Sequence, residues 1–216
     1  MSIGVSIVKS VLWLWLVSLA TLAASAHAAV TPVILVFGDS LSAAYGLAKY
    51  TGWVDLLEQR LRTKQFPHIV INASISGETT SGGAARLPEA LRARRADIVI
   101  LELGANDGLR GLPISAMRSN LQAMISACKD TGARVILVGI RLPTNYGKAY
   151  TEKFQRAFSD LACANRIAFV PSLLDGIETR RELFQSDNVH PTAEAQTIIL
   201  DNVWRVLAPK LREKMP

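Results

Sequence analysis

The chain has 216 residues, 50% of them hydrophobic, and a formal net charge of +6 at pH 7. This length and hydrophobic content allow one folded domain with its own core. The basic residues are scattered, with one tight cluster at Arg92-Ala93-Arg94-Arg95, and they do not alternate with aromatic residues. This pattern argues against a nucleic-acid-binding protein. We expect the charge to form a solvated surface, with attraction to anionic lipids or substrates as the alternative.

The first thirty residues have the pattern of a secretory signal. Lys9 precedes an apolar run from Val11 to Leu22, and Ala26-His27-Ala28 then places small residues at the two positions that signal peptidase recognises. We predict a signal peptide over residues 1–28, cleaved near Ala28, and a periplasmic or secreted mature domain over residues 29–216. The alternative is an uncleaved anchor, but the run is short for a bilayer that needs roughly 20 apolar residues.

Five apolar runs beyond the leader are predicted to be strands. Continuous Val- and Ile-rich runs are typical of parallel strands that are buried on both faces. The runs are Val33 to Phe37, Ile69 to Ala73, Ile98 to Leu103, Val135 to Ile140, and Ile167 to Val170.

Amphipathic helices are predicted between these strands. The first presents Trp53, Leu56, Leu57 and Leu61 on its apolar face. The last begins at about Pro191 and turns Ile199, Val203 and Val206 inward. Regular alternation of strands and helices indicates an α/β domain with a doubly wound sheet and helices on both faces.

Two cysteines remain in the predicted mature domain. A disulfide between Cys128 and Cys163 is the alternative that an oxidising compartment suggests. Helical phase favours two separate thiols, because Cys128 continues the apolar stripe of Met117, Leu121 and Met124, whereas Cys163 falls opposite the stripe of its own helix.

Polar residues follow the strands where ligands usually bind. In doubly wound sheets, ligands occupy the crevice outside the carboxyl ends of the strands. Ser40, Gly77 and Asn106 follow the first, second and third strands, and the segment from Asp187 to His190 precedes the last helix. We therefore expect these residues to line one crevice.

Ser40 and His190 are candidates for a nucleophile and its base. Asp187 lies three residues before His190, so a turn can bring its carboxylate to one imidazole nitrogen and leave the other facing Ser40. His68 begins the second strand, roughly 17 Å from the Gly77 end, and is too distant to serve. The alternative is that Ser40 and the Asp187 segment only cap turns and helices.

Gly77 and Asn106 are candidate donors to an oxyanion. The glycine spacing from Gly77 to Gly82 resembles a P-loop, but Gly83-Ala84 stands where Lys-Ser/Thr is required, so we exclude nucleotide binding. A backbone N–H at Gly77 lets a substrate oxygen approach closely. The alternative for Asn106 is an ordinary turn. No usual zinc ligand set can be assembled, so no metal site is predicted.

Four sequence blocks together resemble the SGNH (GDSL) hydrolases, and most closely the bacterial periplasmic thioesterases, lysophospholipases and arylesterases of that family. The blocks are Gly38-Asp39-Ser40-Leu41-Ser42, Gly77, Gly104-x-Asn106-Asp107 and Asp187-x-x-His190. The resemblance extends over essentially the whole mature domain.

This resemblance implies a flavodoxin-like three-layer sandwich whose five-stranded parallel sheet has the order 2-1-3-4-5, with no metal or organic cofactor. It implies that Ser40 is the nucleophile, His190 the base and Asp187 the partner of that base. The backbone N–H groups of Ser40 and Gly77 and the side chain of Asn106 form the oxyanion hole in this interpretation.

The implied function is a serine esterase or thioesterase that hydrolyses acyl esters and thioesters, such as lysophospholipids, acyl-CoA and aryl esters, through a Ser40-acyl intermediate. The alternatives are an envelope carbohydrate O-deacetylase of the same fold and a non-catalytic envelope binding protein. We expect a monomer with transient membrane-surface contact and no nucleic-acid partner.

Apolar and aromatic residues after the third and fourth strands are expected to contact the acyl chain, with loop packing as the alternative. Two segments that are less typical of the family, Ala43 to Tyr50 and Leu173 to Gln185, are expected to border the same pocket. The predicted substrate-binding residues are Leu109, Leu112, Pro143 and Tyr146.

Overall fold

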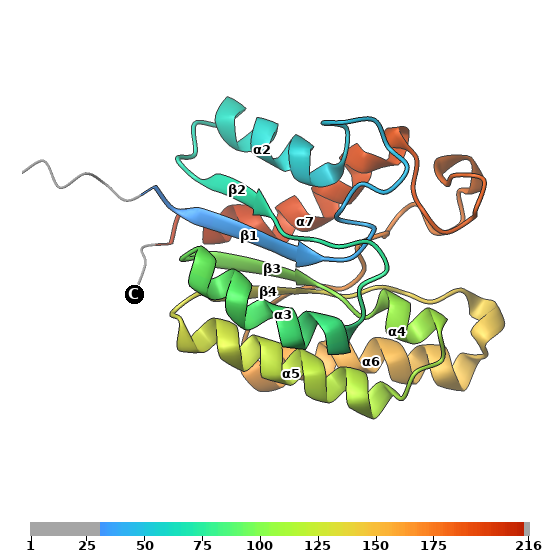
Figure 1. The fold of residues 1–216 in the computed structure, drawn as a ribbon. Helices are drawn as coiled ribbons and strands as arrows, with labels where there is room; N and C mark the ends of the chain where they lie inside the picture. Colours follow the sequence, from blue (N-terminus) through green and yellow to red (C-terminus); the bar gives the residue numbers. More distant parts are fainter. Residues whose placement is uncertain (1–30, 214–216) are drawn as a thin grey trace, which may run out of the picture. The chain divides into compact units, whose positions relative to one another are not determined.

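The computed structural model describes residues 31–213, so the predicted signal peptide lies outside the described residues. The described segment contains a five-stranded parallel sheet with the order β2-β1-β3-β4-β5 (Figure 1). This order agrees with the one that the family resemblance implies. The strands are β1 (Val33–Gly38), β2 (Ile69–Asn72), β3 (Ile98–Glu102), β4 (Arg134–Val138) and β5 (Ala168–Val170).

Helices cover both faces of the sheet. One face carries α2 (Trp53–Thr63) and α7 (Gln196–Lys210), which pack against each other. The opposite face carries α3 (Thr80–Ala93), α4 (Ala105–Leu109), α5 (Ile114–Asp130) and α6 (Lys148–Asn165). Short 3-10 helices at Thr144–Tyr146, Arg181–Leu183 and Ala193–Ala195 lie in the loops.

Burial differs between the central strands and the edge strand β2. Every residue of β3 is buried, and β1 is buried from Ile34 onward. The expectation that all strands are buried on both faces is wrong for β2, where Ile69 is 47% exposed. A strand at the edge of the sheet has one strand neighbour instead of two, so helices cover it less completely.

The last helix begins later than predicted, at Gln196 instead of about Pro191. Pro191 pairs with Phe184 in an isolated antiparallel bridge, and the Thr192 N–H donates to the Leu183 carbonyl at 2.8 Å. These contacts hold residues 191–192 outside the helix. The inward face is otherwise as expected at Ile199 and Val203, whereas Val206 is only half-buried.

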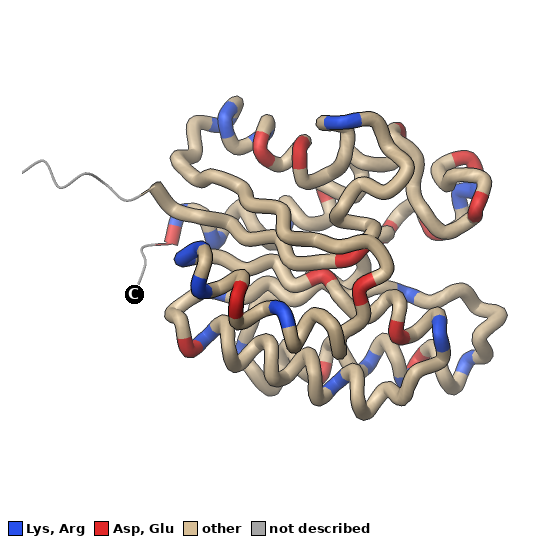
Figure 2. Tube along the Cα trace, in the orientation of Figure 1, with Lys and Arg blue, Asp and Glu red and all other residues tan. Residues whose placement is uncertain are grey.

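Both cysteines are free thiols, as the helical phase predicts. Cys128 is buried in α5, and desolvation by burial raises the pKa of its thiol to about 12. Cys163 is exposed on α6. Within residues 31–213, no helix has the length and apolar character needed to cross a bilayer. Lys and Arg are spread over helices and loops in the view of Figure 2.

A buried carboxyl group lies where β3 ends. Glu102 is 3% exposed, and its Oε2 accepts from the Ser42 hydroxyl at 2.7 Å and from the Asp39 backbone N–H at 3.3 Å. Burial raises the pKa of Glu102 well above 4.5, and the nearby Asp39 carboxylate raises it further. The folded protein therefore favours the protonated form of this side chain.

We predict that Glu102→Gln becomes more stable than the wild type as the pH rises. Below pH 4.5, Glu102 is protonated in both the folded and the unfolded protein. Above pH 4.5, the unfolded chain releases the proton first, because the pKa of Glu102 is raised only in the folded protein. The wild-type unfolding free energy then falls by about 1.4 kcal/mol per pH unit until the pH reaches the raised pKa of Glu102 in the folded protein, whereas glutamine removes this decline. Urea unfolding at pH 4, 6 and 8 measures the difference. An equal loss of stability in the variant at all three pH values would contradict the raised pKa of Glu102.

Candidate active site

Ser40 lies in the turn that follows β1, at the carboxyl edge of the sheet. The turn is closed by Asp39, whose Oδ1 accepts from the Leu41 N–H at 3.0 Å and whose carbonyl accepts from the Ala43 N–H at 2.9 Å. Within residues 31–213, the Ser40 N–H is paired with no acceptor. The turn therefore presents both the hydroxyl and a free backbone donor of Ser40.

A short turn brings Asp187 and His190 together and directs the imidazole toward Ser40. Asp187 Oδ1 accepts from the backbone N–H groups of Val189 and His190 at 2.9 and 3.0 Å, and Oδ2 lies 2.6 Å from His190 Nδ1. His190 Nε2 lies 2.9 Å from Ser40 Oγ. The structure thus aligns the three side chains in the order that the sequence spacing predicts.

The ionisation of Asp187 selects the tautomer of His190. Partial desolvation opposes the charge, but hydrogen bonds from the His190 ring and from the backbone of Val189 and His190 outweigh it and lower the pKa of Asp187 to about 2. An ionised carboxylate only accepts hydrogen bonds, so the neutral imidazole carries its proton on Nδ1. Nε2 is then left as the acceptor that faces the Ser40 hydroxyl.

Two residues that sequence reasoning missed, Tyr45 and Gln185, support the segment that carries the imidazole. Gln185 Nε2 donates to the Tyr45 carbonyl at 2.9 Å, and the Gln185 N–H donates to the His190 carbonyl at 2.7 Å. The Tyr45 ring lies 4.5 Å, centroid to centroid, from the His190 ring. Tyr45 and Gln185 belong to the two segments that were expected to border an acyl pocket, and in the structure both contact the residues around the base.

Gly77 lies in the loop after β2 and has a φ of +79°, a conformation that favours glycine. Its carbonyl accepts from Arg110 Nη2 at 3.1 Å, and the Ile75 N–H ties the same loop to the Gly38 carbonyl at 3.0 Å. In the described part of the chain, the Gly77 N–H has no acceptor. This glycine therefore offers a backbone donor at the same edge as Ser40.

Asn106 lies in the first turn of α4, and its amide is already engaged. Nδ2 donates to Asp39 Oδ2 at 3.1 Å and to the Glu78 carbonyl at 3.0 Å. Asn106 therefore lies beside the Ser40 turn, as predicted, but both of its N–H groups have partners. Donation to a ligand requires the amide to share or release one of these bonds.

The other two aspartates at this edge do not hydrogen-bond to His190. Burial raises the pKa of Asp39 to about 6, against the opposing effects of the Leu41 N–H, the nearby His190 and the Asn106 amide. Asp107 accepts from the Thr80 N–H at 2.8 Å and the Thr80 hydroxyl at 2.6 Å, so it binds the first residue of α3, whose N-cap is Thr79. Among the three aspartates, Asp187 alone contacts the imidazole.

The predicted acyl contacts lie in the segments that follow β3 and β4, at the same edge: Leu109 ends α4, Tyr146 ends a 3-10 helix, and Leu112 and Pro143 lie in loops. The Tyr146 hydroxyl donates to the Leu109 carbonyl at 3.0 Å, which brings these two residues together. Leu109 is half-buried, whereas Pro143 is exposed and Leu112 is 38% exposed. Their positions are compatible with acyl contacts and with loop packing alike.

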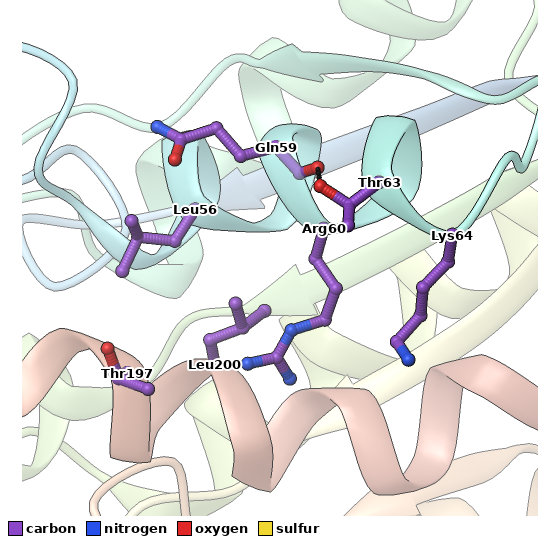
Figure 3. A pocket seen from close by; sticks show the side chains of 7 residues that line it. All are labelled: Leu56, Gln59, Arg60, Thr63, Lys64, Thr197 and Leu200. Atoms are coloured by element: carbon purple, nitrogen blue, oxygen red, sulfur yellow. Dashed lines mark hydrogen bonds between the residues drawn. The ribbon is translucent and has the colours of Figure 1, made fainter.

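Two surface pockets lie away from Ser40. Figure 3 shows one of about 320 Å³ between α2 and α7, where Arg60 extends from α2 toward α7. The other is lined by residues of α6 and by Phe169 and Pro171. Over residues 31–213, no group of three or more His, Cys, Asp or Glu side chains is placed to hold a metal ion.

Comparison with known proteins identifies relatives that span most of the chain. Esterase TesA of Pseudomonas aeruginosa is 44% identical over 183 residues, which are 85% of this chain and 91% of the relative. An arylesterase of Vibrio mimicus is 42% identical over 187 residues, 87% of this chain and 94% of the relative. Thioesterase 1/protease 1/lysophospholipase L1 of Escherichia coli K12 is 36% identical over 183 residues, 85% and 86% of the two chains.

The fold is likewise similar to solved structures. The crystal structure of TesA superposes with a TM-score of 0.81 at 44% identity, covering 82% of this chain and 98% of that one. Residues 36–198 match the model of the GDSL-like Lipase/Acylhydrolase family. The chain therefore belongs to the GDSL-like lipase/acylhydrolase family, the SGNH hydrolases.

Proposed function

We propose that this chain, an ester hydrolase by its relatives, cleaves acyl esters and thioesters through a covalent intermediate on Ser40. The observation that carries the proposal is the hydrogen-bonded line from Asp187 Oδ2 through His190 to Ser40 Oγ, with separations of 2.6 and 2.9 Å. A nucleophile, its base and a group that orients the base are the minimum set for acyl transfer.

In the acylation step, His190 Nε2 takes the Ser40 proton while Oγ attacks the substrate carbonyl carbon. The carbonyl oxygen becomes a tetrahedral oxyanion that accepts from the N–H groups of Ser40 and Gly77 and from the Asn106 amide. The imidazolium then protonates the leaving oxygen or sulfur atom as the C–O or C–S bond breaks, and an alcohol or thiol is released. Asp187 stabilises the imidazolium and holds its tautomer throughout.

Deacylation repeats these steps with water as the nucleophile. His190 Nε2 removes a proton from water, the hydroxide adds to the acyl carbon, and the same three donors stabilise the second oxyanion. Collapse of this intermediate expels Ser40, which recovers its proton from the imidazolium, and releases a carboxylic acid.

The substrates that we propose are acyl esters of lipids and aryl alcohols, together with acyl thioesters. The names of the relatives cover esterase, arylesterase, thioesterase and lysophospholipase activities, which supports this range. We place Leu109, Leu112, Pro143 and Tyr146 against the acyl chain because they lie in the segments that follow β3 and β4, at the Ser40 edge. We further propose a monomeric enzyme that contacts membrane surfaces transiently.

The location that we propose is the periplasm or the exterior of the cell, after cleavage near Ala28. The charge and apolar pattern of residues 1–28 supports this proposal. Acyl-CoA is scarce outside the cytoplasm, so lysophospholipids and other esters are the natural substrates in this proposal.

We predict that Ser40→Ala lowers hydrolysis of p-nitrophenyl butyrate by at least ~10³-fold without loss of folding, because the covalent route is removed. Ser119→Ala, at an exposed position of α5, is the control and keeps wild-type turnover. A panel of lysophosphatidylcholine, acyl-CoA and acetylated glycans defines the substrate class. Near-wild-type turnover by Ser40→Ala would show that Ser40 is not the nucleophile.

A second prediction separates the three aspartates. Asp187→Asn should lower kcat by about 10³–10⁴-fold, because an amide favours the wrong imidazole tautomer. Asp107→Asn should act mainly on stability, through its hydrogen bonds to Thr80, and Asp39→Asn through stability and the local geometry of Asn106. Steady-state kinetics and melting temperatures of the three variants distinguish these effects. If Asp187→Asn keeps nearly all activity while a folded Asp39→Asn or Asp107→Asn is inactive, Asp187 is not the partner of His190.

A further inference from the structure

One side chain holds both ends of the loop that carries Gly77. Arg86, on α3, donates from Nη1 to the Ala73 carbonyl at 2.8 Å and from Nε to Glu78 Oε2 at 3.1 Å. Ala73 directly follows β2, and Glu78 directly follows Gly77. The conformation of the loop between them is therefore tied to one guanidinium group.

The guanidinium is itself fixed against the core. Its Cζ lies 4.0 Å from the centroid of the Phe37 ring, and Phe37 is fully buried in β1. The side chain of Arg86 is 26% exposed and that of Glu78 is 13% exposed, so the ion pair is largely shielded from solvent. A planar cation stacked on an aromatic face and bonded on its edge has little freedom to move. Arg86 thereby couples the Gly77 loop to the strand that ends next to Ser40.

Gly82 provides the space for this ion pair. A Cβ atom at Gly82 would lie only 2.1 Å from Glu78 Oε1. Gly82 and Arg86 lie four residues apart on one face of α3, and Glu78 directly precedes Thr79, the N-cap of that helix. The glycine that gives this segment its P-loop-like spacing thus leaves room for the Glu78 carboxylate.

The same loop also contacts Asn106, the side-chain donor of the proposed oxyanion hole. The Glu78 carbonyl accepts from Asn106 Nδ2 at 3.0 Å. Displacement of Glu78 would therefore shift the Gly77 N–H on one side and remove a bond of the Asn106 amide on the other.

We infer that Arg86 is a positioning residue for the oxyanion hole, acting through Glu78 in the space that Gly82 leaves open. This inference rests on the proposed function, because it assigns the Gly77 N–H and the Asn106 amide to the oxyanion. Arg86 touches no reacting atom in this account. Its effect is to keep the two donors where the negative charge develops.

The test uses Arg86→Met, which keeps an unbranched apolar chain over Phe37 and removes the N–H donors. We expect kcat to fall by about 10- to 100-fold with KM within about threefold, because misplaced donors weaken the transition state more than substrate binding. The inhibition constant of an alkylboronic acid, which forms a tetrahedral adduct on Ser40, should rise by a similar factor. Arg92→Met, at an exposed position of the same helix, is the control.

Gly82→Ala tests the same mechanism without altering Arg86. Alanine favours an α-helix over glycine, so the melting temperature should be maintained or raised, while the new Cβ displaces the Glu78 carboxylate. A fall in kcat without a fall in melting temperature therefore supports positioning. If Arg86→Met does not fold, the role of Arg86 is tested with Gly82→Ala and Arg86→Lys, by their kcat, melting temperature and boronic acid inhibition constant.

The inference and the proposed function fail in different ways. Wild-type protein without Ser40-dependent turnover contradicts the proposed function. Ser40-dependent turnover that is unchanged in folded Arg86→Met and Gly82→Ala, with unchanged boronic acid affinity, overturns the role of Arg86 alone.

Discussion

The parallel pairing of β1 with β3, in which Gly38 lies opposite Glu102, is the constraint on which the site depends. Because these neighbouring strands end at the same edge, the Ser40 turn and the start of α4 emerge side by side. The contact between Asn106 and Asp39 follows from this register. β2 then adds the Gly77 loop on the other side of β1, and the Asp187–His190 turn completes the arrangement.

The residues predicted from sequence are those whose position depends on local pattern. Ser40 and Asn106 follow apolar strands, and the spacing of Asp187 and His190 matches a single turn. Contacts between segments far apart in the chain leave no such pattern. The tilted contact between the Tyr45 and His190 rings depends on loop conformations that hydrophobic periodicity does not encode, and so does the hydrogen bond from Arg86 to the Ala73 carbonyl. The later start of α7 likewise reflects a tertiary bridge at Pro191.

Two aspartates near Ser40 occupy opposite electrostatic environments. Asp187 is partly exposed and accepts three hydrogen bonds, which lower its pKa to about 2. Asp39 is fully buried, and burial raises its pKa to about 6. A carboxylate that stays ionised suits a partner for an imidazolium, whereas a buried carboxyl that binds Leu41 and Asn106 suits the geometry of the turn. The difference in environment thus separates two roles within one residue type.

Covalent labelling shows directly whether Ser40 attacks the acyl carbonyl. Wild-type protein is treated with one equivalent of a p-nitrophenyl alkylphosphonate, and the modified residue is identified by peptide mass spectrometry. We expect a single adduct on Ser40, release of p-nitrophenol in equal amount, and no adduct in Ser40→Ala. Loss of activity with the adduct on another residue and Ser40 unmodified would contradict this expectation.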